Sequence, residues 1–176
     1  QNRLAVFRRA GDALEAAPAF EATTLERPAD VRPRQMVGTV RVHPNGRFVY
    51  VANRHDATVE FAGRPVNGGG ENSLGLGRQH IRACFVIDAA SGAPRLVGHA
   101  ATQGIHCRNF AFDPAGRLLA ASHIMGGAVR EGDAVRELPC CISLFRVGAD
   151  GRLAFARKYD VDLGERHLFW MGLVDY

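Results

Sequence analysis

Hydrophobic residues in this chain occur in short runs, and the runs are separated by Gly, Pro, Asp and Asn. Several runs alternate apolar and polar residues, as in 39–42, while others are continuously apolar, as in 48–52. No stretch keeps the 3.6-residue period of an amphipathic helix, and short runs bounded by turn residues are typical of β-strands. The pattern therefore predicts an all-β fold.

One segment of the chain occurs twice: residues 39–53 are repeated 70 positions later as residues 109–123. Each copy has a β-like run, a Pro-x-Gly turn and a second β-like run. Proline fixes one turn dihedral and glycine permits the unusual ones, so each copy is predicted to form a hairpin. The matched turn residues are Pro44, Gly46 and Arg47 in the first copy and Pro114, Gly116 and Arg117 in the second.

A second kind of hairpin follows each copy, over residues 84–99 and 141–157. Four antiparallel strands thus form one unit, and tandem repetition of such units is the mark of a β-propeller, with a β-sandwich as the alternative. We expect a single partial propeller domain over 1–176, of about two and a half blades plus one closing strand. Its parts would be an outer hairpin at 4–21, blades at 37–101 and 108–161, and the closing strand at 168–174.

The repeat spacing exceeds the ~40–45 residues of a minimal blade, so each blade is expected to carry a long excursion after its second strand. These excursions are residues 56–82 and 124–139, and both are rich in glycine. Long loops on a rigid scaffold are where binding groups concentrate. The alternative is that both are solvated insertions.

Composition and charge exclude several classes of protein. The chain has 176 residues and a net charge of +4, but its 22 basic residues are scattered and include only one lysine, Lys158. We therefore expect no nucleic-acid stripe. The longest apolar run, 168–174, is far shorter than the ~20 residues that span a bilayer, so no membrane segment is expected.

The four cysteines, including the adjacent pair Cys140 and Cys141, do not form a spaced disulfide framework. This favours a reducing, cytoplasmic setting. The chain begins with Gln1 and shows no signal-peptide pattern, so we expect the original N-terminus to lie elsewhere. Metal motifs and glycine-rich nucleotide loops are absent from the sequence, and we expect no cofactor.

Four ordered motifs resemble the seven-bladed β-propeller lactonases, which include propeller-type 6-phosphogluconolactonases and fungal muconate-lactonizing enzymes. They are Asn53-Arg54, Gly69-Gly-Glu-Asn-Ser73, Gly104-Ile-His-Cys-Arg108 and Leu168-Phe-Trp-Met-Gly172. The resemblance implies the C-terminal half of a bacterial hydrolase, with its N-terminal blades supplied by the full-length chain. An acidic residue and a histidine that the family uses in catalysis would lie in those blades.

The sequence departs from the family pattern at three places: Cys107 replaces a usual proline, 75–80 looks like an insertion, and Cys140-Cys141 replaces small residues. These departures, with the acidic residue expected outside the chain, favour a non-catalytic propeller segment that serves as an interaction surface. Lactonizing chemistry on a muconate-type acid is another alternative. The leading hypothesis is hydrolysis of a small sugar lactone, 6-phosphogluconolactone, as in carbohydrate metabolism.

Propeller geometry predicts which residues meet. The second strand of a blade ends at the rim where the next inner strand begins, so the pair Arg54–His55 is expected to converge with His106 and Arg108. His43 lies at the opposite turn and cannot join them. A turn acceptor is the expected role of His43.

Lactone hydrolysis needs a base for water, donors for the developing oxyanion and cations for an anionic substrate. Arg108 and Arg54 are the expected binding groups, and His106 or His55 the expected base. Asn53 and Glu71 are two further residues that we expect to bind the substrate. The alternatives are an inter-blade salt bridge for Arg108 and plain backbone hydrogen bonds for the histidines. Trp170 is expected to be a buried core residue.

Overall fold

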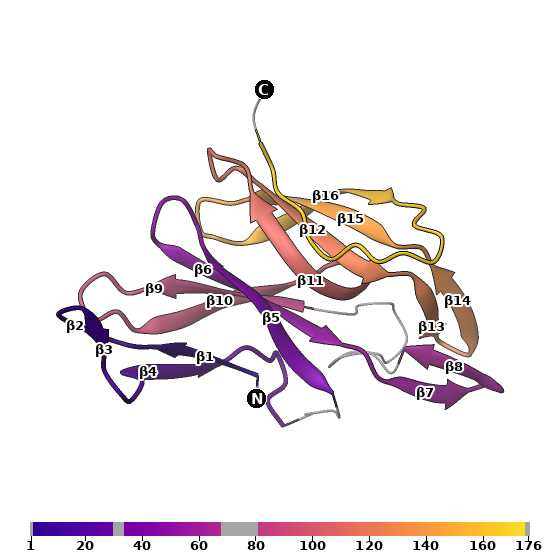
Figure 1. Ribbon diagram of the computed structural model, residues 1–176, viewed down its shortest axis with the longest axis horizontal. Coiled ribbons are helices and arrows are strands. Elements are labelled where there is room, and N and C mark those ends of the chain that lie inside the picture. The colour runs from indigo at the N-terminus through magenta and orange to yellow at the C-terminus, as the bar shows by residue number, and fades with distance from the viewer. Residues whose placement is uncertain (1, 30–33, 68–80, 175–176) are drawn as a thin grey trace.

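The computed structural model describes residues 2–29, 34–67 and 81–174 of the chain. Those residues form sixteen β-strands and no helix (Figure 1). The prediction of an all-β fold is confirmed. None of the described residues belongs to a helix long and apolar enough to cross a membrane.

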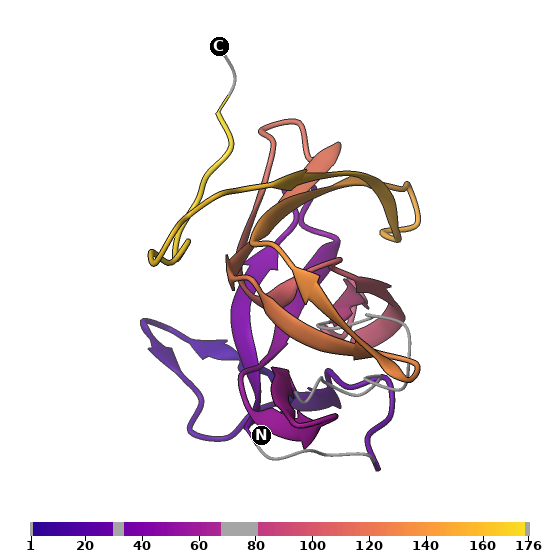
Figure 2. The same ribbon diagram turned by 90° about the vertical axis from the view of Figure 1, so that its right-hand side faces the viewer.

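Two four-stranded antiparallel sheets form the body of the molecule, and they are the two predicted repeats (Figures 1 and 2). In the first, the spatial order is β10-β9-β6-β5, and in the second it is β11-β12-β15-β16. The first blade consists of β5 (Gln35–Val42), β6 (Phe48–His55), β9 (Ile81–Ile87) and β10 (Pro94–Ala101). The second blade consists of β11 (Ile105–Phe112), β12 (Leu118–Met125), β15 (Cys141–Val147) and β16 (Leu153–Asp160).

The matched turns of the two repeats lie against each other at one end of the blades. Gly46 and Gly116 have φ values of +73° and +69°. Residues with a side chain rarely adopt such backbone conformations, which explains the glycine at both turns. His43 Nε2 lies 2.7 Å from the carbonyl oxygen of Gly116. His43 is therefore a turn residue far along the strands from Arg54, as the sequence predicts.

The core lies between the two blades. Alternate residues of β6 point to opposite sides, so Phe48 and Tyr50 pack against β11 and β12 of the second blade while Val49 and Val51 face the N-terminal hairpin. The Tyr50 hydroxyl donates a 2.6 Å hydrogen bond to the Gly151 carbonyl across the interface. The main inter-blade cluster comprises Phe48, Tyr50, Ala52, Cys84, Cys107, Phe110, Leu119, Ala121 and Phe145.

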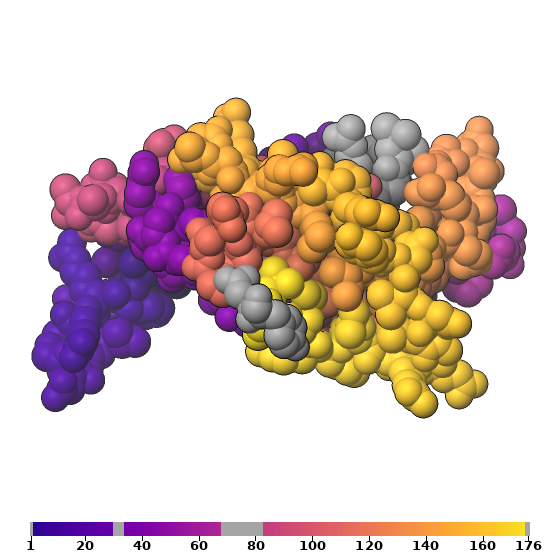
Figure 3. Space-filling view, turned by 90° about the horizontal axis from the view of Figure 1, so that it is seen from above, coloured from indigo at the N-terminus to yellow at the C-terminus, as the bar shows by residue number. Residues whose placement is uncertain are grey.

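The N-terminal hairpin differs from the expected one in its pairing. Its long arms are β1 (Arg3–Val6) and β4 (Phe20–Thr23), and a tip of β2 (Arg9–Ala10) and β3 (Ala13–Leu14) surrounds the predicted Gly11 turn. The sequence places the second arm directly after the turn. Pro18 has no amide hydrogen for a ladder, so the arm resumes beyond it. Figure 3 shows this hairpin projecting at one end of the molecule.

Both excursions form hairpins where the sequence predicts only glycine-rich segments. The first contains β7 (Thr58–Phe61) and β8 (Arg64–Asn67), and the second contains β13 (Gly127–Glu131) and β14 (Ala134–Leu138). A parallel bridge joins Val129 to Asn67, so the four strands make one sheet in the order β14-β13-β8-β7. This sheet, here called the hairpin sheet, connects the two blades.

Residues 168–174 are not part of a strand here, because no described strand pairs with them in a ladder, and their closing role stays a prediction. The segment still lies beside the second blade: the Leu168 amide donates to the Ile124 carbonyl, and Asn109 Nδ2 donates to the Met171 carbonyl over 2.9 Å (Figure 3). Trp170 is 69% exposed, which contradicts the expected core position.

Candidate functional site

The end of β6 and the start of β11 meet at one rim, and Arg54 and His106 touch there. Arg54 Nη1 lies 2.9 Å from His106 Nε2. A guanidinium can only donate, so Nε2 is the acceptor and the neutral ring carries its hydrogen on Nδ1. The predicted convergence of these two residues is thus present in the structure.

His106 is held as a neutral imidazole. Burial lowers its pKa to about 4; the positive charges of Arg54 and Arg108 act in the same direction, and Asp56 opposes them. Only 5% of its surface is exposed, and its φ of +55° lies in the left-handed region that non-glycine residues rarely adopt. At neutral pH this ring is a hydrogen-bond acceptor and not a cation.

Arg54 and Arg108 concentrate positive charge at the same rim. Burial and the neighbouring charge of Arg108 lower the pKa of Arg54. Arg108 is half-buried and its guanidinium lies 5.3 Å from the ring centre of Phe169. Within the described part of the chain, no carboxylate forms an ion pair with either arginine. The inter-blade salt bridge considered for Arg108 is therefore not seen there.

The backbone around Arg108 is fixed by the first blade. Thr39 Oγ1 donates a 2.8 Å hydrogen bond to the Arg108 carbonyl. A Cβ added to Gly38 would lie 3.3 Å from the same carbonyl oxygen and 3.5 Å from Arg54 Cδ. The glycine thus lets β5 pass close to both arginines. These contacts leave the Arg108 side chain facing the rim and Phe169.

Asp56 is an acidic residue of the rim that was not among the site residues predicted from the sequence. Its carboxylate pairs with Arg34 in two parallel contacts of 2.7 Å, which lower the pKa of the carboxyl. Electrostatic interactions with His106 and His55 act in the same direction. The sequence could have indicated Asp56 as a site residue, because it directly follows Arg54 and His55. Its partner Arg34 could not be foreseen without knowing that β5 begins beside the end of β6.

Two other predicted residues point away from this cluster. Asn53 and His55 lie on the face of β6 opposite Arg54, because neighbouring residues of a strand alternate. Asn53 is bound to Thr24: the Thr24 hydroxyl donates to Oδ1 over 2.7 Å, and Nδ2 donates to the Thr24 carbonyl over 2.6 Å. An electrostatic interaction with His55 nevertheless helps to lower the pKa of His106. Glu71 lies outside the described residues.

The glycine of the motif at 104–108 has a packing cause. A Cβ on Gly104 would lie 2.6 Å from both Cys141 Sγ and His123 Cγ, so no larger residue fits. Cys107, which replaces the family's usual proline, is fully buried in the inter-blade core. Cys140 and Cys141 are buried and unbridged, and burial raises the pKa of both thiols. These departures are accommodated as packing residues.

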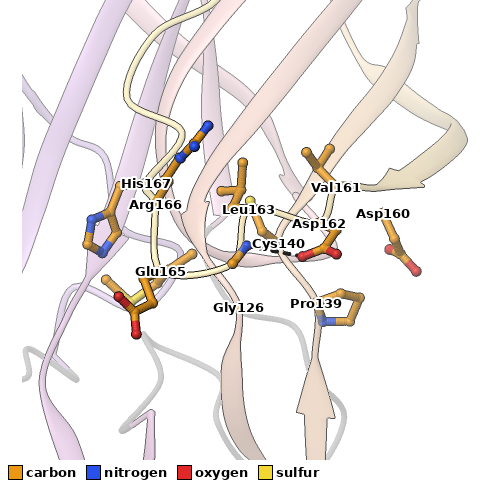
Figure 4. Close-up of a pocket in the computed structure, with 12 residues that line it drawn as sticks. Gly126, Pro139, Cys140, Asp160, Val161, Asp162, Leu163, Glu165, Arg166 and His167 are labelled. Atoms are coloured by element: carbon orange, nitrogen blue, oxygen red, sulfur yellow. Dashed lines mark hydrogen bonds between the residues drawn. The ribbon is translucent and has the colours of Figure 1, made fainter.

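A pocket of about 670 Å³ lies one blade further along, where Met125 and Gly126 end β12 (Figure 4). These residues correspond in the repeat to His55 and Asp56. The pocket brings together one guanidinium and several carboxylates, so it suits an anion less well than the Arg54–Arg108 rim. Its charged lining residues are Asp160, Asp162, Glu165 and Arg166, with His167 beside them. Sequence analysis did not identify it.

Tandem four-stranded antiparallel sheets, packed with inner strands β5 and β11 in contact, define a β-propeller architecture. Residues 2–130 match the family model described as lactonase, 7-bladed beta-propeller. The chain therefore belongs to the seven-bladed β-propeller lactonase family, as the motifs predict.

Individual relatives agree with this assignment. A curated relative from Formosa agariphila, named 6-phosphogluconolactonase, is 34% identical over 80 residues, which are 46% of this chain and 17% of the relative. A solved candidate 6-phosphogluconolactonase from Bacteroides fragilis has a TM-score of 0.60 at 22% identity, over 92% of this chain and 34% of its own. The periplasmic gluconolactonase of Pseudomonas aeruginosa has a TM-score of 0.59 at 21% identity, over 91% and 34%.

The structural likenesses show the fold alone. The chain spans about a third of the length of the solved structures that it resembles. It also spans less than a fifth of the curated relative.

Proposed function

We propose that this chain carries part of the active site of a lactonase that hydrolyses a small sugar lactone, with 6-phosphogluconolactone as the leading substrate. The observation that carries the proposal is the rim cluster: two arginines without a paired carboxylate among the described residues flank a buried, neutral histidine. Family membership and the name of the Formosa agariphila relative support the choice of reaction.

The cluster offers groups suited to opening a lactone. Arg54 and Arg108 are placed to bind the carbonyl oxygen and the negative charge that develops on it. When the substrate oxygen takes the Arg54 N–H, the Nε2 lone pair of His106 is released. That nitrogen then accepts a proton from the attacking water. The water oxygen bonds to the carbonyl carbon and the ring C–O bond breaks. The ring oxygen takes the proton from His106 Nε2 and leaves as a hydroxyl, which returns the imidazole to its neutral form.

The charge of the rim favours an anionic substrate and product. Hydrolysis yields a carboxylate, and the leading substrate also carries a phosphate, so both present oxygens that arginine can bind with two parallel hydrogen bonds. We propose a role for this activity in sugar metabolism, in the pentose phosphate pathway. In this proposal, Glu71 and residues from the other blades of the ring complete the site.

We place this activity in the cytoplasm, because the four cysteines are buried and unbridged. The solved neighbour from Pseudomonas aeruginosa is described as periplasmic. Fractionation of cells that express the native gene tests the assignment. Recovery with a periplasmic marker would overturn it.

The test of the function is the rate at which the full-length protein hydrolyses 6-phosphogluconolactone, corrected for spontaneous opening and compared with the rate for the unphosphorylated gluconolactone. We expect catalysed opening of both, with a higher kcat/KM for the phosphorylated lactone. Equal kcat/KM values would leave a lactonase but refute the phosphate preference. No rate above the spontaneous one would refute the enzyme and favour an interaction surface.

A further inference from the structure

The hairpin sheet lies directly after the rim strands and is tied together by contacts between its two hairpins. Arg64 Nη2 donates a 2.6 Å hydrogen bond to Glu137 Oε1, and the Arg130 guanidinium lies 4.2 Å from the ring centre of Phe61. Together with the parallel bridge of β8 to β13, these contacts make the two excursions one body.

The hairpin sheet packs against the side chain of Ile105, the residue before His106. Ile105, Val129 and Leu138 form a separate buried cluster with exposures of 3%, 0% and 7%. A Cβ added to Gly127 would lie 3.4 Å from Ile105 Cδ1, so the start of β13 also covers this side chain. Ile105 thus reaches into the hairpin sheet from the first position of β11.

His106 follows Ile105 in an uncommon backbone conformation. A left-handed φ is strained in a residue that carries a side chain, and it persists only where the surroundings hold it. On one side of the residue, the Arg54 guanidinium contacts the imidazole. On the other, the chain enters the apolar cluster through Ile105. Both contacts restrain this conformation.

We propose that Val129 and Leu138 are positioning residues of the site: by burying Ile105, they hold His106 in its left-handed conformation with Nε2 facing Arg54. The packing of Val129 and Leu138 on Ile105, here called the clamp, thus fixes the position of His106 at the rim. This inference rests on the proposed function only in treating the rim cluster as the active site.

The test replaces Val129 by Ala and follows the imidazole of His106 by NMR titration, with the signal assigned by its loss in H106N. Loosening of the clamp lets water reach the ring and weakens its contact with Arg54. Its pKa should then rise from about 4 toward the ordinary 6.5. The charged and titratable groups that act on the ring are Arg54, Asp56, Arg108 and His55, and none is altered by the substitution.

Two controls separate positioning from general destabilisation. Val59→Ala lies in the same sheet at a side chain that is 52% exposed, and it should leave the His106 pKa unchanged. Phe85→Leu removes volume from the cluster on the other side of the first blade. It should lower the thermal midpoint without moving that pKa. If V129A does not fold, the milder Leu138→Val is measured in the same way.

The proposal is overturned if V129A, or L138V in its place, lowers the midpoint while the His106 pKa stays at the wild-type value. The titration needs no turnover, so it decides the clamp even if lactonase activity is absent. Where lactones are hydrolysed, V129A should lower kcat by about tenfold and change KM by less than about twofold. An equal loss in the F85L variant would show a merely structural effect.

Discussion

Replacing Arg108 by Ala should abolish most catalysis at little cost to folding. In the described structure, the guanidinium makes no ion pair, and its one ring contact is the 5.3 Å approach to Phe169, which is itself 51% exposed. Such an exposed cation–π contact is worth about 0.5–1 kcal/mol. The carbonyl of residue 108 keeps its hydrogen bond from Thr39, because the backbone is unchanged.

The catalytic loss should be much larger. Removing one donor to a developing oxyanion typically costs about 10²–10³ in kcat, or roughly 3–4 kcal/mol. We therefore expect R108A to lose at least about a hundredfold in kcat/KM on 6-phosphogluconolactone, while its free energy of unfolding falls by less than about 1 kcal/mol.

Two measurements on each protein check this expectation: lactone hydrolysis corrected for the spontaneous rate, and urea unfolding. Arg95→Ala, at an exposed arginine of the outer strand β10, is the matched control and should change neither quantity. Arg108→Lys keeps the charge but loses the two-pronged hydrogen bonding, so its rate should lie between those of R108A and the wild type. Wild-type activity in R108A, or unfolding by several kcal/mol, would refute the assignment of Arg108 to the site.

Two further predictions concern stability. Asn53→Ala removes two buried hydrogen bonds to Thr24 and should cost about 2–3 kcal/mol in urea unfolding with KM unchanged; an unchanged stability with a raised KM would instead make Asn53 a substrate ligand. The lowered pKa of His106, about 4 against an ordinary 6.5, means that the unfolded chain binds the proton more tightly, so stability should fall by about 2 kcal/mol between pH 6.5 and 4. Urea unfolding across that range should show this loss in the wild type and not in H106Q, and equal losses in both would contradict it.

The blades were predictable because their signals are local. The repeated turns around Gly46 and Gly116 and the apolar run of β6 are features of the nearby sequence. Even the meeting of Arg54 with His106, which are 52 positions apart, follows from the repeat once strand direction is fixed. Predictions of this kind need only the unit and its orientation.

The rest depends on pairing between distant segments. The bridge of Val129 to Asn67 joins two excursions that have no sequence likeness, so the hairpin sheet could not be foreseen. Arg34 meets Asp56 because β5 begins where β6 ends, a matter of register. The segment 168–174 has the composition of a strand, but a strand forms only where a partner supplies its hydrogen bonds.

The central claim is that the rim of Arg54, His106 and Arg108 binds the substrate anion, and a titration with the product 6-phosphogluconate tests it most directly. Followed by imidazole NMR, saturating product should perturb the His106 resonances and raise the pKa of this ring, because a bound anion offsets the arginine charges. His167, beside the acidic pocket at the next blade, should not respond. Saturable changes at His167 with none at His106 would contradict the account.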